Sequence, residues 1–164
     1  MLPVIRGSVI LQEVAEPVGR DELFAWFTEP DRLSRWMGVD AAVDLRPGGE
    51  FSCTLPGDRH WDGLVVEVDP PSRLVVTLGW REPSIGLPPG MSLVAWDFYL
   101  DARGSRLRMV HDHVPADLLV LHNDTWSRLF ARLRNVLLGR VPGPHPLEDL
   151  DRRMRELEAE GGLT

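Results

Sequence analysis

Residues 117–141 read DLLVLHNDTWSRLFARLRNVLLGRV, and they are the only long stretch of the chain whose apolar residues keep a helical period. The residues at steps of three and four are Leu119, His122, Trp126, Leu129, Leu133 and Val136, and Phe130 and Leu137 widen the stripe. This spacing predicts a long helix with one apolar face. Because most of the preceding chain reads as strands, we expect that face to cover the apolar side of a sheet.

The segments before this helix have a period of two, which is typical of strands with one buried face. Turns rich in Pro, Gly and Asp separate about seven such strands, at residues 8–14, 41–45, 50–55, 60–68, 73–80, 92–100 and 106–113. Two short helices, ending at Thr28 and Trp36, are predicted after the first strand. Short turns between consecutive strands favour antiparallel pairing, so the sequence predicts an α+β fold.

The alternation also predicts which side chains face the interior. In the fourth predicted strand it places Leu64, Val66 and Val68 together on one face. The Pro/Gly-rich loop at residues 82–90 carries Ile85 and Leu87, which we expect to be exposed.

The end of the chain is set apart by the sequence Pro-Gly-Pro-His-Pro at residues 142–146, which is a stiff linker. After it, acid-before-base pairs one turn apart predict a helix, and its apolar residues are Leu147, Leu150, Met154 and Leu157. We therefore divide the chain into a domain of residues 1–141 and a linker with an extra amphipathic helix, residues 142–164. We expect this helix to dock on its own domain or to form a homodimer with a second subunit.

The composition argues against several functional classes. The chain of 164 residues has a formal net charge of −7 and contains no Lys, which is unfavourable for binding nucleic acid. Its single cysteine, Cys53, excludes an internal disulfide framework and suits a reducing cytoplasm. The sequence shows no signal-peptide pattern, and no apolar run approaches the length of a membrane span. We expect a cytoplasmic protein that binds neither nucleic acid nor membrane.

Five segments resemble a known protein family in their order. They are DELFAWFTEPDRLSRWMG at 21–38, RPGGEF at 46–51, DGLVVEVDPPSRLVVTLGW at 62–80, SRLRMVHDHVP at 105–115 and HNDTWSRLFARL at 122–133. They are similar to the heat-shock-protein-90 ATPase activator-like family of the SRPBCC superfamily, which includes START, birch-pollen-allergen and polyketide-cyclase-like proteins. The resemblance covers residues 5–140, and Thr125 departs from it by standing where the family often has Gly. It implies a helix-grip fold, in which a curved antiparallel sheet wraps around the C-terminal helix and leaves a cavity between them.

The Trp residues come from different elements, and several should point into that one cavity. We predict that an apolar or amphipathic small molecule binds there, since ligand pockets are largely apolar with a few polar groups. The predicted ligand-binding residues are Trp36, Phe51, Trp80, Trp96, Phe98, Met109, His111, His113, His122 and Trp126. A second interpretation is that these side chains, with Trp61, fill the core of a small domain.

Three of these residues are histidines, whose rings could bind a ligand or transfer a proton. His111 and His113 alternate onto the face of Leu107 and Met109, so the pleat should turn both rings inward, towards His122. We expect them to form the polar end of the cavity and to titrate together near neutral pH. The alternative is that they are structural histidines whose rings are satisfied by hydrogen bonds to the backbone. No fixed-spacing metal motif occurs, so we predict no metal and no cofactor. Cys53 has no adjacent base and reads as an inert core residue.

Three functions remain open from the sequence. The first is binding of a small apolar ligand. The second is a cyclase- or hydrolase-type enzyme that uses the cavity histidines as acid or base. The third, implied by the family resemblance, is a chaperone-associated protein-interaction module; fold similarity alone does not decide among them.

Overall fold

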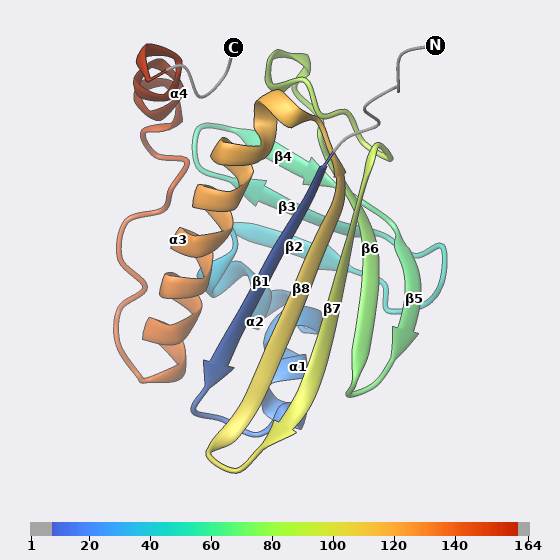
Figure 1. Cartoon of the computed structure of the whole chain (residues 1–164). Coiled ribbons are helices and arrows are strands. Elements are labelled where there is room, and N and C mark those ends of the chain that lie inside the picture. Colours follow the sequence, from blue (N-terminus) through green and yellow to red (C-terminus); the bar gives the residue numbers. More distant parts are fainter. Residues whose placement is uncertain (1–7, 161–164) are drawn as a thin grey trace.

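The computed structural model describes residues 8–160, apart from the side chains of residues 151, 157 and 158 (Figure 1). The strands are β1 (Ser8–Glu16), β2 (Asp40–Val43), β3 (Phe51–Leu55), β4 (Arg59–Asp62), β5 (Val65–Asp69), β6 (Arg73–Trp80), β7 (Ser92–Asp101) and β8 (Gly104–Val114). The helices are α1 (Arg20–Thr28), α2 (Pro30–Trp36), α3 (Leu119–Leu137) and α4 (Leu150–Ala159), with short 3-10 turns η1 (Pro83–Ile85) and η2 (Ala116–Leu118).

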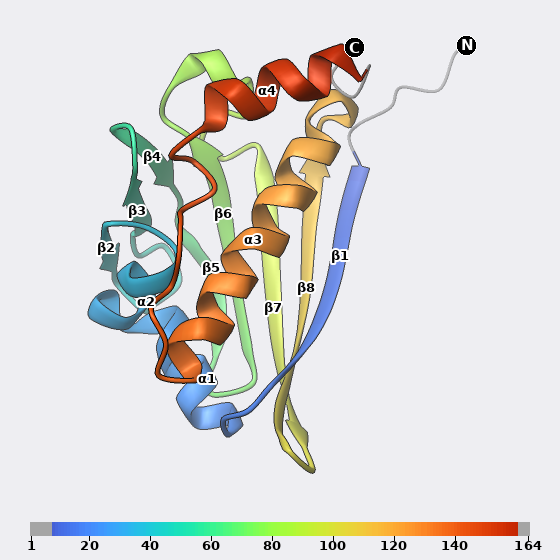
Figure 2. The ribbon, with the colours of Figure 1, turned by 90° about the vertical axis from the view of Figure 1, so that its left-hand side faces the viewer.

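The strands form one antiparallel sheet in the order β1-β8-β7-β6-β4-β3-β2, and β5 pairs with β6 beside this path. In Figure 2, β1 lies on one side of α3 and β2 to β4 lie on the other, so the sheet curves around the helix. The α+β fold with a curved antiparallel sheet and a long C-terminal helix is therefore confirmed. The apolar face of α3 and the concave face of the sheet enclose the core.

The sheet has eight strands because the fourth predicted strand is two strands. Gly63 separates β4 from β5, and a Cβ atom there would lie 2.0 Å from the carbonyl oxygen of Thr77, so only glycine allows this approach of the two backbones. Val65 stays in phase with the buried Trp61 and is 1% exposed, whereas Leu64 is 52% exposed.

The predicted inward face of this segment is therefore wrong for Leu64 and Val66, which both face outward. A register irregularity between Val65 and Glu67 changes the alternation, and Val68 again packs against the core.

The long loop between β6 and β7 also differs from the prediction, since Ile85 and Leu87 are buried. The backbone N–H of Trp80 donates to the carbonyl of Leu87 at 2.6 Å, which folds the loop back over the end of β6. The loop thereby places two apolar side chains at the end of the core where α3 begins, since Gly86 lies close to Leu118.

The tail turns back along α3 and carries α4 to the other end of the molecule (Figure 2). Leu147 and Leu150 are buried in the main core, so the expected docking takes place on the tail's own chain. His145 donates from Nε2 to the carbonyl of Met37 at 2.8 Å, and Arg132 donates from Nε to the carbonyl of Trp36 at 3.0 Å. Both bonds cap carbonyls at the C-terminal end of α2. The side chain of Leu157 lies outside the described residues.

Candidate functional site

Aromatic rings occupy the interior between the sheet and α3. All the predicted ligand-binding residues except His113 are buried there. Ring centroids of Trp61 and Trp126 lie 5.2 Å apart, and those of Trp96 and Trp126 lie 5.9 Å apart. The structure thus brings side chains from the sheet, α1, α2 and α3 into one aromatic cluster, whose members are Phe27, Trp36, Phe51, Trp61, Trp80, Trp96, Phe98, Trp126 and Phe130.

His113 does not join this cluster, and the prediction that its ring points inward is wrong. Its φ of 62° is in the left-handed region, and its side chain is 56% exposed. The β1–β8 register shifts between the pairs Ser8–Val114 and Ile10–His111, so β8 has one more residue than β1 at this point. The bulge turns the ring of His113 outward and ends the alternation that a regular strand would keep.

His111 is held by two hydrogen bonds that fix its tautomer. The indole Nε1–H of Trp126 donates to Nδ1 of His111 at 3.0 Å. Because an indole nitrogen can only donate, the proton of the neutral imidazole is on Nε2, which donates to Oγ of Ser92 at 2.8 Å. The Ser92 hydroxyl in turn donates to the carbonyl of Leu78 at 2.5 Å.

His122 is held in the same manner with the opposite tautomer. The indole Nε1–H of Trp80 donates to its Nε2 at 3.0 Å, so the proton is on Nδ1, which donates to the carbonyl of Leu118 at 2.8 Å. The two imidazole rings, one from β8 and one from α3, lie 5.9 Å apart between centroids. They form a polar layer beside the aromatic cluster, as the sequence predicts for His111 and His122.

Burial keeps both imidazoles neutral. Desolvation, together with the nearby His122, lowers the pKa of His111 to about 3. Desolvation also lowers the pKa of His122 to about 4, against the opposing effect of the bond to Leu118. The expectation that these histidines titrate near neutral pH is therefore wrong.

These bonds also limit the chemistry of the site. Both nitrogens of each buried imidazole are occupied, so neither ring can take or give a proton without losing an internal hydrogen bond. The Ser92 hydroxyl donates to a carbonyl rather than to a base, so it is not an activated nucleophile. Within residues 8–160, no group of three ligating side chains is placed to hold a metal ion.

One fully buried polar group of the cluster has no hydrogen-bond partner among the described residues. The indole N–H groups of Trp36, Trp80 and Trp126 each have an acceptor, at 2.9 to 3.0 Å. Trp96 is 0% exposed, and its Nε1 has no acceptor among residues 8–160. An unsatisfied buried donor is costly, so the N–H of Trp96 marks a position where a hydrogen-bond acceptor would be stabilised.

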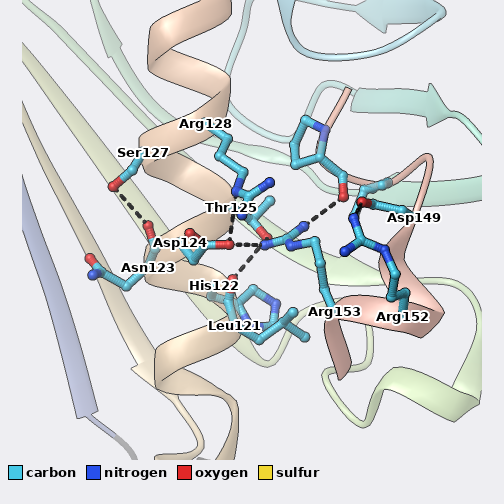
Figure 3. Close-up of polar contacts among 12 residues, drawn as sticks. Leu121, His122, Asn123, Asp124, Thr125, Ser127, Arg128, Asp149, Arg152 and Arg153 are labelled. Atoms are coloured by element: carbon cyan, nitrogen blue, oxygen red, sulfur yellow. Dashed lines mark hydrogen bonds and ion pairs between the residues drawn. The ribbon is translucent and has the colours of Figure 1, made fainter. Parts of the chain in front are cut away.

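The tail is joined to α3 at Asp124 and Thr125. The buried guanidinium of Arg153 donates to the carbonyl of Pro146 at 2.6 Å, to Oγ1 of Thr125 at 3.1 Å and to the carboxylate of Asp124 (Figure 3). Arg128 also pairs with Asp124, at 3.1 Å. Thr125 lies about one turn from His122, and Asp124 lies two residues from it, so Arg153 attaches α4 to the part of α3 that carries His122.

Some of these functional contacts have no signal in the sequence. Ser92 lies on a strand without any motif, and Arg153 is one of several Arg residues in a charged helix. Their roles come from tertiary neighbours. Asp124 and Arg128 form an ion pair four residues apart on α3, whereas Arg132 on the same helix is buried against backbone carbonyls.

A curved antiparallel sheet that grips a long C-terminal helix defines a helix-grip protein, a ligand-binding type of domain. The sequence profile of the activator of Hsp90 ATPase homolog 1-like proteins matches residues 17–138, and the chain belongs to this family. The match covers α1, α2, α3 and the strands β2 to β8; it begins just after β1 and ends before the linker to α4.

Solved structures agree with this assignment. An AHSA1-like protein from Rhizobium etli is 34% identical, with 85% of this chain and 88% of that chain covered and a TM-score of 0.67. CalU16 from Micromonospora echinospora is 25% identical, with 92% and 85% covered and a TM-score of 0.64. An Aha1 dimer from Colwellia psychrerythraea is 14% identical, with 79% and 96% covered and a TM-score of 0.68, which shows the shared fold alone.

A comparison with curated proteins found no match. Among residues 8–160, no helix combines the length and the apolar character needed to cross a bilayer.

Proposed function

We propose that the protein binds a small apolar or amphipathic molecule between the sheet and α3, with its apolar body among the aromatic rings and a hydrogen-bond acceptor at the indole N–H of Trp96. The observation that carries this proposal is the unsatisfied N–H of Trp96 at the centre of the aromatic cluster. A ligand oxygen or aromatic nitrogen at this point would remove the cost of an unpaired donor. The surrounding rings would supply contact area for an aromatic or alicyclic body.

The ligand in this proposal must be uncharged where it meets the histidine layer. His111 and His122 are neutral and have no free nitrogen, so they offer neither a cation nor a vacant hydrogen bond. The same observation argues against the enzyme alternative, because acid–base catalysis by these rings would need a free nitrogen with a pKa nearer to neutral.

Substitution Trp96→Phe tests the proposal. It removes the N–H but keeps a large apolar ring, so affinity for a ligand that accepts this hydrogen bond should fall about tenfold, since such a bond contributes about 1–1.5 kcal/mol. The ligand can be found by native mass spectrometry of protein purified without denaturation, and its affinity measured by titration into the unloaded protein.

The matched control is Trp26→Phe. Trp26 also has a buried indole N–H without a partner within residues 8–160, but its ring lies beside Arg32 and Arg35 and outside the cluster. Its substitution should leave the affinity unchanged. Equal affinities for the wild type and a folded Trp96→Phe variant would refute the assignment of this donor, and a protein that carries no small molecule and binds none of an apolar library would refute the binding function itself.

In this proposal, residues 1–141 form the ligand-binding domain of a cytoplasmic protein, and residues 142–164 are a segment added to it. A homodimer that involves the C-terminal helix is a second proposal, motivated by the Aha1 dimer from Colwellia psychrerythraea. Light scattering of the full-length chain at several concentrations tests it, and a monomeric mass throughout would exclude it.

A further inference from the structure

A hollow with a volume of about 570 Å³ lies between the helix α3 and the tail that follows it. Residues 128–135 of α3 form one wall, and residues 142–149, which run back alongside the helix in Figure 2, form the other. The described residues that line the hollow all lie outside the aromatic cluster, so this place is separate from the interior site. The family profile ends at residue 138, so the second wall lies outside the sequence shared with the family.

The two walls are fixed to each other by hydrogen bonds. Nδ2 of Asn135 donates to the carbonyl of Pro142 at 3.1 Å, and Nη1 of Arg132 donates to the carbonyl of Gly143. Farther along the tail, the buried His145 donates to a carbonyl at the end of α2. Prolines at alternate positions of this linker restrict the backbone further, since the proline ring fixes φ. The hollow is therefore formed in advance, and a ligand need not order the chain in order to bind.

The helix wall contributes a guanidinium group that forms no ion pair with the described part of the chain. Arg132 is 8% exposed, and its Nε donates to the carbonyl of Trp36 at 3.0 Å while its Nη1 donates to Gly143. Its Nη2 has no acceptor among residues 8–160. Desolvation lowers the pKa of Arg132, as expected for a buried cation, but the guanidinium stays charged. Nη2 is therefore a charged donor that is available to an anion in the hollow.

The tail wall contributes a carboxylate that is also without a charged partner. Glu148 is exposed, lines the same hollow and forms no ion pair with a described residue. Its charge raises the pKa of Arg132 against the effect of burial, so the two groups act on each other although they do not meet. The hollow thus has one uncompensated charge of each sign, on opposite walls.

The other two charged residues that line the hollow are already paired. Arg128 pairs with Asp124 at 3.1 Å, and Asp149 pairs with Arg152 (Figure 3). Ala131 on the helix and the proline rings on the tail add apolar surface. A complementary ligand therefore carries a negative group, a positive group and an apolar body.

We propose that this hollow binds a small zwitterion of the amino-acid class. Its carboxylate accepts from Nη2 of Arg132, its ammonium group donates to Glu148, and its apolar side chain lies on the proline rings. A carboxylate bound to a buried guanidinium is a strong, charge-assisted contact, and it supplies most of the affinity. The contact with the exposed Glu148 is weaker and supplies selectivity, because an acid that lacks the amine meets the like charge of Glu148.

The probe for this proposal is L-phenylalanine, which is titrated into the isotope-labelled full-length chain and followed by the backbone amide signals in NMR. Signals of Ala131 and Gly143 report this hollow, and the signal of Trp96 reports the interior site. We expect L-phenylalanine to shift the first two. Phenethylamine, which lacks the carboxylate, should bind at least tenfold more weakly. Hydrocinnamate, which lacks the amine, should bind about fivefold more weakly.

Glu148→Gln isolates the weaker contact. It removes a carboxylate at an exposed position, so it should lower the affinity for L-phenylalanine about threefold and remove the difference from hydrocinnamate. The matched control is Glu22→Gln, at an exposed residue of α1 outside the hollow, and it should leave both affinities unchanged. Arg132→Met removes the stronger contact, and in a folded variant it should abolish the binding of L-phenylalanine.

Several results would overturn the proposal. These are unmoved signals of Ala131 and Gly143 in the presence of L-phenylalanine, equal affinities of the wild type for the three compounds, or equal effects of the two Glu substitutions. Shifts confined to the surroundings of Trp96 would overturn it as well. Such shifts would at the same time support the interior site, so the two proposals fail independently.

Discussion

Removal of residues 142–164 should lower the free energy of unfolding by about 3–6 kcal/mol. Leu147 and Leu150 are both almost fully buried in the main core, and burial of each such side chain contributes about 1.5–3 kcal/mol. The melting temperature of a domain of this size should fall by roughly 10–20 °C. Calorimetry of the full chain and of the 1–141 fragment measures the difference. An unchanged melting temperature would show that the tail does not stabilise the domain.

Two arginines of α4 provide a matched pair for the same prediction. Arg153 is buried and joins the tail to Thr125 and Asp124 of α3, whereas Arg155 is exposed. Arg153→Ala should cost about 2–3 kcal/mol, because it leaves the carbonyl of Pro146 and the hydroxyl of Thr125 without their charged partner. Arg155→Ala should change stability by less than about 0.5 kcal/mol. Equal effects of the two substitutions would contradict the role given to Arg153.

Acidification from pH 7 to pH 5 should destabilise the protein steeply. His111, His122 and His145 are all buried, and desolvation lowers their pKa values to about 3, 4 and 4 from the ordinary value of 6.5. Below pH 6.5 the unfolded chain binds protons that the folded chain does not. The free energy of unfolding therefore decreases as the pH is lowered, until the pH reaches the pKa values of the folded protein. Each group contributes a slope of about 1.4 kcal/mol per pH unit, which gives roughly 6 kcal/mol for the three at pH 5.

Urea unfolding at intervals between pH 7 and pH 5 measures this slope. His145→Gln serves as the internal control, since it removes one of the three groups and should reduce the slope by about a third. The buried carboxyl of Glu16 has a pKa raised by desolvation, so its contribution has the opposite sign and does not imitate the effect. Stability that stays flat between pH 7 and pH 5 would show that the imidazoles accept protons in the folded state.

Sequence patterns predict best those elements whose structure depends on residues nearby in the chain. The helix period around Trp126 fixes α3 to within a few residues of its observed ends, and Pro30 separates the two short helices as expected. The division of residues 60–68 at Gly63 is harder to predict, because it depends on the approach of Thr77 from another strand. His113 is misplaced for the same reason, since a bulge depends on the register with β1.

The candidate site, too, has features that local sequence patterns predict and features that depend on tertiary contacts. Periodicity turns His111, His122 and Trp126 inward correctly, because each lies on an apolar face. It gives no information about hydrogen-bond partners, and these partners decide the chemistry. In all three buried histidines, one nitrogen accepts from an N–H group and the other donates to an oxygen. Only the folded structure shows that these rings have no nitrogen left for catalysis.

The aromatic cluster also has an optical consequence. Trp61 lies in ring contact with both Trp80 and Trp126, and Trp126 lies in contact with Trp96, with centroid separations of 5.2 to 5.9 Å and large angles between the rings. Transition dipoles this close couple, so we expect the absorption bands of these four indoles to interact with one another. The near-ultraviolet circular dichroism of the native protein should therefore be strong, and the arrival of any guest among the rings should be visible without a label.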